Sequence, residues 1–159
     1  MPTVTETTEL HEILGDLVQA THRLTRLAAR LTGNQESPAT WRTLSVLKST
    51  GPLRLGELAA HSRVSQPTMT KIVRNLVETE WVKRIADTDD ARAWQIALTA
   101  KGHSALMAWR DQLASALLPL FEGLHAGDVE AMRRAVEIVS NRVELTEATA
   151  AVIRESDHA

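Results

Sequence analysis

The hydrophobic positions of this chain first follow a helical period. Between residues 10 and 31 they recur at i, i+3, i+4 and i+7, which is the spacing of one helix face. The stripe consists of Leu10, Ile13, Leu14, Leu17, Val18, Leu24, Leu27, Ala28 and Leu31. Gly33 and Asn34 predict the end of this helix, which is about six turns long. A long amphipathic helix must bury its stripe somewhere, and a second copy of the chain is one candidate.

A second helix is predicted to begin at residue 38. Ser37 suits the cap and Pro38 suits the first helical position, while the Gly-Pro pair at 51–52 stops the helix. Its apolar face consists of Trp41, Leu44 and Leu47.

The next segment predicts two helices joined by a short turn. Residues 53–55 are expected to be extended, residues 57–62 to form a short helix and residues 63–64 to form the turn. Ser65 then caps another helix. The stripe of this helix consists of Met69, Ile72, Val73 and Leu76.

The spacing of the hydrophobic residues changes to every second position after residue 80. Residues 81–85 predict a strand, and the acidic segment 87–90 has the composition of a turn. In the segment that follows, Trp94, Ile96 and Leu98 form one apolar face. Two strands around an acidic turn predict a β-hairpin.

A long helix is expected after the hairpin, with Thr99 as its cap. Pro119 lies within the pattern and should kink the helix near residues 115–118. The stripe consists of Leu106, Trp109, Leu113, Leu117, Leu120 and Phe121.

A last helix is predicted after a break at residues 125–127, with Asp128 as its cap. The polar tail after about Ile153 is expected to fray. The residues expected to face inward are Val129, Met132, Val136, Val139 and Val143.

Composition narrows the possible functions. The 159 residues include no cysteine, which excludes disulfides and thiolate zinc sites. No apolar run approaches the ~20 residues of a membrane span, and the first ten residues do not resemble a signal peptide. We therefore expect a cytoplasmic protein that does not act at a membrane. The histidines lack metal-ligand spacing, and no nucleophile elbow or phosphate loop is present, so we expect no metal, no cofactor and no enzymatic activity.

The charge is unevenly distributed, although the net charge is only −2. Residues 41–102 contain ten Lys or Arg against six Asp or Glu, and the remainder of the chain is acidic. A basic middle segment suits a polyanionic partner. A solvated charged surface explains the same numbers equally well.

The order of elements between residues 55 and 98 is that of a winged helix-turn-helix, whose second helix enters the DNA major groove. Glutamine can pair with adenine, and lysine or arginine with guanine. The N-terminus of the helix at Ser65 suits a phosphate, and Pro67 adds an apolar contact. The polar residues off the buried stripe are Gln66, Thr68, Thr70, Lys71 and Arg74. A plain solvent-facing surface would also be polar, but the hairpin and the local positive charge favour DNA.

From about Leu10 to Val143 the chain resembles the MarR family, the multiple-antibiotic-resistance type of bacterial transcriptional regulator. The most specific part is the wing element Asp90-Ala91-Arg92, followed by Leu98-Thr99-x-Lys-Gly. The other matching segments are LGELA at 55–59, VSQPTMTKIVRNL at 64–76 and VKR at 82–84.

This resemblance implies a mainly α fold with a small β-hairpin wing, assembled as an intertwined homodimer. Residues 1–36 would form an N-terminal dimerisation helix, residues 37–99 the winged helix-turn-helix lobe, and residues 100–159 the C-terminal dimerisation helices. The two recognition helices would read an inverted-repeat operator in double-stranded DNA, about one helical turn apart. The protein would be a repressor relieved by a ligand, although activation uses the same lobe.

The resemblance also assigns the wing. Arg92 would enter the minor groove, with Asp90 holding it, or the two could form a salt bridge that only shapes the hairpin. Two departures matter: Glu80 stands where the family commonly has glycine, and Asp89 and Ala91 replace basic residues of the wing.

We therefore expect weak or selective wing contacts, with most of the DNA affinity coming from Lys71, Arg74, Lys83, Arg84 and the recognition helix. The alternative is an interaction protein that keeps the winged-helix fold without tight DNA binding.

Proteins of this type often respond to small aromatic or phenolic acids, bound in the crevice between the dimer layer and the lobe. A tryptophan could stack on such a ring, and Arg26 could pair with its carboxylate. The candidates here are His22, Arg26, Trp41, Leu44 and Trp109. For each residue taken singly, we prefer the simpler interpretation that the tryptophans are core residues and Arg26 is a surface charge.

Overall fold

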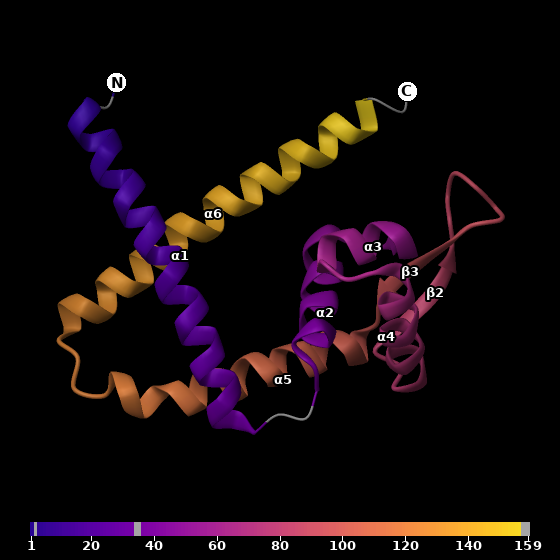
Figure 1. Cartoon of the computed structure of the whole chain (residues 1–159), viewed down its shortest axis with the longest axis horizontal. Helices are drawn as coiled ribbons and strands as arrows, with labels where there is room; N and C mark the ends of the chain where they lie inside the picture. Colours follow the sequence, from indigo (N-terminus) through magenta and orange to yellow (C-terminus); the bar gives the residue numbers. More distant parts are fainter. Residues whose placement is uncertain (2, 34–35, 157–159) are drawn as a thin grey trace. The chain divides into compact units, whose positions relative to one another are not determined.

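The computed structural model describes residues 1, 3–33 and 36–156, in two compact units, Met1–Pro119 and Leu120–Ala159. The first unit contains most of the secondary structure (Figure 1). Its elements are α1 (Val4–Thr32), α2 (Pro38–Thr50), β1 (Leu53–Arg54), α3 (Leu55–Ser62), α4 (Gln66–Glu78), β2 (Val82–Ala86), β3 (Trp94–Leu98) and α5 (Ala100–Leu117). A 3-10 turn, η1 (Leu118–Phe121), follows α5, and the second unit contains α6 (Ala126–Ser156). The predicted mainly α fold with a small hairpin is confirmed.

Side-chain caps determine where the helices start. Ser37, Ser65 and Thr99 each accept a backbone N–H three residues later, as the sequence predicted. The first helix is longer than its stripe suggested, because Thr3 and Glu6 form a reciprocal capping box ahead of it. It ends where predicted, at Gly33 in the left-handed conformation (φ 59°).

The predicted hairpin of β2 and β3 is confirmed, and it belongs to a three-stranded sheet in the order β1-β3-β2. The two-residue strand β1 pairs antiparallel with β3, Leu53 opposite Ile96 and Arg54 opposite Gln95. The sequence predicted that this segment is extended, but not which strand it joins.

The core of the first unit lies beneath the helix-turn-helix. The predicted stripe of α4 is buried throughout: Met69, Ile72, Val73 and Leu76 are at most 9% exposed. It packs with Leu44 of α2 and Leu58 of α3, both 0% exposed, and with Val82 and Ile96 of the sheet. This packing fixes α3, α4 and the hairpin as one lobe.

Several local expectations were wrong. Trp94 is 60% exposed rather than part of the apolar face, because it lies at the wing end of β3 beyond the last core residue. Pro119 does not kink a continuing helix; α5 ends at Leu117 and the chain tightens into η1. Helix α6 begins at Ala126, which puts Asp128 inside the first turn rather than at the cap. The helix includes residues 153–156, and the remainder of the tail, where fraying was expected, lies outside the described residues.

The stripe of α6 that was expected to face inward is exposed within this chain. Its residues Val129, Met132, Val136, Val139 and Val143 are 38–66% exposed. The N-terminal part of α1 likewise exposes Leu10, Ile13, Leu14 and Val18 by 49–55%. Each stripe thus lacks a cover within its own unit. No helix in the described part of the chain is long and apolar enough to cross a membrane.

Candidate nucleic-acid interface

A tight turn joins α3 to α4 within the lobe. Arg63 takes the left-handed conformation (φ 56°) and donates its backbone N–H to the carbonyl of Ala60, while Val64 donates to Ala59. The Ser65 hydroxyl accepts the N–H of Thr68 at 3.3 Å and lies 2.9 Å from the Thr68 hydroxyl. The start of the recognition helix is therefore fixed by its own backbone and cap.

The outer face of α4 presents the residues predicted to contact DNA. Ser65, Gln66, Pro67, Thr68, Thr70, Lys71 and Arg74 are all exposed. The hydroxyls of Ser65, Thr68 and Thr70 take part in local hydrogen bonds, Thr70 to the carbonyl of Gln66 at 3.0 Å. Lys71 and Arg74 form no ion pair with any described residue, so their charges are available to a phosphate or a base.

The wing loop is shaped by Asp87, which the sequence did not single out beyond its turn chemistry. Its side chain is 2% exposed, and its Oδ2 accepts a hydrogen bond from Nε of Arg54 at 2.7 Å. It also accepts the backbone N–H groups of Asp89 at 2.9 Å and Asp90 at 3.1 Å. The Arg54 guanidinium and these N–H groups hold the pKa of the Asp87 carboxyl well below its usual range. Asp87 thus ties the loop to β1.

Asp90 and Arg92 are connected through the main chain. The Asp90 carboxylate accepts the backbone N–H of Arg92 at 2.9 Å, whereas no ion pair joins the two side chains in the described structure. Arg92 is exposed at the wing, which extends beyond the helices of the lobe (Figure 1). Asp90 therefore shapes the loop and leaves the Arg92 guanidinium unpaired.

Lys83 and Arg84 are both exposed on β2. Being consecutive residues of a strand, they leave opposite faces of the hairpin. Arg84 lies opposite Ile96 and Lys83 opposite Ala97. Arg84 therefore shares the face of Ile96, and Lys83 shares the face of Ala97.

Glu80, which stands where the resemblance to the MarR family leads one to expect a common glycine, takes the left-handed conformation (φ 61°) that glycine would favour. This costs a non-glycine residue about 1–2 kcal/mol. Two contacts hold the turn: the Thr99 hydroxyl donates to the Glu80 carbonyl at 2.6 Å, and Lys101 pairs with the Glu80 carboxylate at 3.0 Å. The departure in sequence therefore keeps the glycine-type turn.

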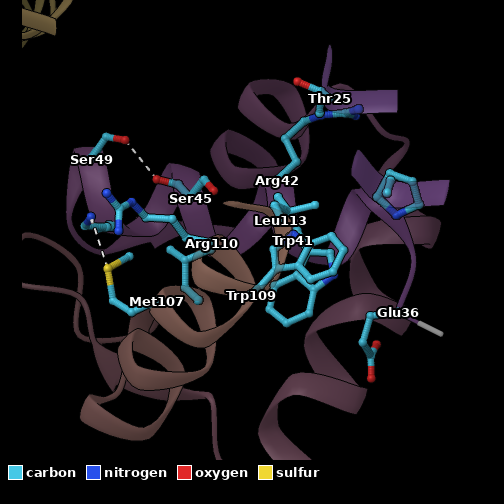
Figure 2. Close-up of a pocket in the computed structure, with 14 residues that line it drawn as sticks. Thr25, Glu36, Trp41, Arg42, Ser45, Ser49, Met107, Trp109, Arg110 and Leu113 are labelled. Atoms are coloured by element: carbon cyan, nitrogen blue, oxygen red, sulfur yellow. Dashed lines mark hydrogen bonds between the residues drawn. The ribbon is translucent and has the colours of Figure 1, made fainter. Parts of the chain in front are cut away.

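A cavity of about 690 Å³ lies among α1, α2 and α5. Its central feature is the stacked pair of Trp41 and Trp109, whose ring centroids are 5.0 Å apart with planes at 15° (Figure 2). The Trp41 ring also stacks on Trp81, at 5.5 Å. Away from the rings, the Met107 sulfur lies 4.0 Å from Nζ of Lys48. The cavity therefore combines an aromatic surface with charged groups.

Two of the five predicted effector residues line this cavity, namely Trp41 and Trp109. Leu44 is 0% exposed and belongs to the core, while His22 and Arg26 are exposed on α1 outside the lining. The prediction missed the cations of the lining, which are Arg42, Lys48 and Arg110. Helical spacing could have found only Lys48, which lies seven residues after Trp41 and so shares its face, because Arg42 and Arg110 directly follow the two tryptophans in sequence.

Arg42 links the cavity to the helix-turn-helix. Its Nη1 donates to the carbonyl of Ser62, the last residue of α3, at 3.0 Å. The Trp41 Nε1–H is buried and has no hydrogen-bond partner in the described structure. In the described part of the chain, no group of three or more His, Asp or Glu could hold a metal ion.

Comparison with known proteins agrees with this geometry. The model of the MarR family matches residues 37–94. The uncharacterized HTH-type transcriptional regulator YpoP of Bacillus subtilis (strain 168) is 32% identical over 69 residues. That match covers 43% of this chain and 49% of YpoP, about half the length of this relative.

Solved structures show the same fold. The transcriptional regulator Tm0710 from Thermotoga maritima is 18% identical, with a TM-score of 0.67 over 86% of this chain and 96% of that one. A mutant of MarR from E. coli is 20% identical, with a TM-score of 0.62 over 79% of this chain and 95% of that one. The resemblance drawn from the sequence motifs is confirmed.

Proposed function

We propose that this chain, whose residues 37–94 match the model of the MarR family, is a homodimer that binds an inverted-repeat DNA operator. In this proposal it acts in the cytoplasm as a repressor, and a small aromatic acid bound in the cavity lowers its affinity for DNA. Helix α4 enters the major groove and the β2–β3 wing reaches the neighbouring minor groove.

The observation that carries DNA binding is a set of unpaired cations on one lobe. Lys71, Arg74, Lys83, Arg84 and Arg92 are exposed, and none forms an ion pair with a described residue. An unpaired lysine or arginine can neutralise a phosphate without first breaking an internal contact. Such contacts release counterions and make the affinity depend on salt.

The dimer is supported by the uncovered stripe of α6. Its residues Val129, Met132, Val136, Val139 and Val143 alternate in steps of three and four, which is the a/d spacing of a coiled-coil seam. Leaving such a seam in water is unfavourable, and a second copy would cover it. A two-fold dimer also matches the symmetry of an inverted repeat.

The effector class is supported by the chemistry of the cavity. The indoles of Trp41 and Trp109 contribute aromatic surface to the lining. Arg42, Lys48 and Arg110 supply three positive charges to the lining. An aromatic ring with one anionic group uses both features.

The DNA proposal is tested with a fluorescent duplex of the DNA upstream of its own gene, titrated at two salt concentrations beside a random duplex. We expect tighter binding to the upstream duplex and weaker binding at higher salt. Arg74→Glu should abolish the preference, whereas Arg23→Glu, an exposed charge on α1, should leave it unchanged.

Equal, weak binding to both duplexes would lead to selection from genomic fragments, which finds an operator located elsewhere. If no fragment is enriched, the repressor proposal fails and the alternative, a winged-helix interaction protein, takes its place.

A further inference from the structure

Gly56 is the second residue of α3, a position where glycine is unfavourable relative to alanine in a helix. Its backbone is not left-handed, so the conformation does not demand glycine. The space around it is occupied by a side chain: a Cβ built on Gly56 would lie 2.7 Å from Nε2 of Gln66 and 3.9 Å from Cδ of Gln66. The carboxamide of Gln66 therefore occupies the place that any other residue at position 56 would fill.

Gln66 is the first residue of α4, on the face proposed to meet DNA. Its side chain is exposed, and its carboxamide has no hydrogen-bond partner among the described residues. A glutamine carboxamide offers both a donor and an acceptor, the pair that the major-groove edge of adenine complements. Lying against the Gly56 backbone limits the directions in which this carboxamide can point.

We propose that Gly56 is a positioning residue that orients the Gln66 carboxamide to read one base, an adenine, in the major groove. This inference rests on the DNA-binding function proposed above. It adds a specificity determinant that itself lies outside the recognition helix.

The backbone cannot easily relieve a clash at this point. Helices α3 and α4 share the core through Leu58 and Met69, each 0% exposed. The close atom belongs to the far end of a flexible side chain, so an added Cβ should displace the Gln66 carboxamide and leave the helices in place. Gly56→Ala should therefore change base preference without lowering stability.

The first test needs no DNA. In the wild-type protein we expect a nuclear Overhauser effect between the Gln66 side-chain amide and the Gly56 α-protons, with the amide signal assigned by its loss in Gln66→Ala. In Gly56→Ala the amide signal should shift, and the melting temperature should be equal to or above that of the wild type. No contact in the wild type, or an unshifted amide in the variant, overturns the geometry.

The second test measures affinity for the selected operator and for its single-base variants. A bidentate contact is worth about tenfold or more between bases. Gln66→Ala should lose this preference at one symmetry-related pair of positions, and Gly56→Ala should reduce it at the same pair by about threefold or more. The double variant should lose no more than Gln66→Ala alone, because the two residues act through one contact.

Gly127→Ala is the matched control, because a Cβ there meets nothing within 4 Å; its base preference should equal that of the wild type. If Gly56→Ala keeps the full wild-type preference, or if Gln66→Ala loses none, the inference is wrong although DNA binding stands. If the wild type prefers no duplex at all, the proposed function fails and the assignment of Gln66 to a base fails with it. The nuclear Overhauser effect between Gln66 and Gly56 then still shows whether the contact between the two residues exists.

Discussion

Replacing Val136 by aspartate tests the proposed dimer at the most exposed residue of the α6 stripe. Val136 is 66% exposed and lies at the centre of the α6 stripe. Full burial of a valine side chain contributes about 1.5–3 kcal/mol, so the part still exposed offers about 1–2 kcal/mol on dimer formation. In a two-fold interface each substitution counts twice, which gives about 2–4 kcal/mol.

Val136→Asp forfeits this contribution and also places two carboxylates at the seam. A tenfold change in the dissociation constant corresponds to about 1.4 kcal/mol. The lost burial alone should therefore increase the dissociation constant by a factor between about 30 and several hundred. The desolvation of the carboxylates adds to that increase. The assay is sedimentation velocity over a range of concentrations, with circular dichroism to confirm that the helices are intact.

Asn141→Asp is the control, because Asn141 is exposed on the same helix and lies off the stripe. It adds the same charge and should leave the dimer unchanged. A wild-type chain that is monomeric at all concentrations, or a Val136→Asp variant that dimerises as tightly as the wild type, refutes the reasoning. An equal loss in both variants would mean that net charge, rather than burial at the seam, controls association.

Three other predictions concern the first unit. Leu58→Ala should lower the free energy of unfolding by about 2–5 kcal/mol, because Leu58 is 0% exposed, and urea denaturation measures this. Asp87→Asn should be destabilising at neutral pH. The folded-state pKa of Asp87 is depressed, so its carboxylate contributes fully to the free energy of unfolding above the unfolded pKa near 4, and this contribution declines at lower pH. Denaturation at a series of pH values should therefore show the free energies of unfolding of the two proteins converging in acid. Arg42→Met should weaken the binding of 1-naphthoate, which is measured by the quenching of tryptophan fluorescence. It should also lower the melting temperature, because the Ser62 carbonyl loses its hydrogen-bond donor. Saturable quenching with equal affinity in both proteins would contradict the role of Arg42.

The local elements could be predicted because the interactions that set them span only a few residues. Ser37, Ser65 and Thr99 each satisfy an N–H three positions later, so their helices begin where the sequence indicates. The spacing of the stripe from Met69 to Leu76 sets which face of α4 is buried, and therefore which polar residues remain outside. The candidate DNA-contact residues of α4 were predicted in this way.

The tertiary structure alone decided the contacts between distant segments. Arg54 meets Asp87 across 33 positions, and this pair, rather than Asp90, ties the wing to β1. The apolar pattern of α6 predicted a stripe but not whether its own chain would cover it, because hydrophobic burial has no direction along the sequence.

The same distinction applies to the space around individual side chains. The cavity at Trp41 and the close approach of Gln66 to Gly56 depend on how helices pack, to within a few ångströms. Periodicity determines which face of a helix a residue occupies. It does not determine which atoms of another helix that face meets, because those distances follow from the packing of the whole lobe.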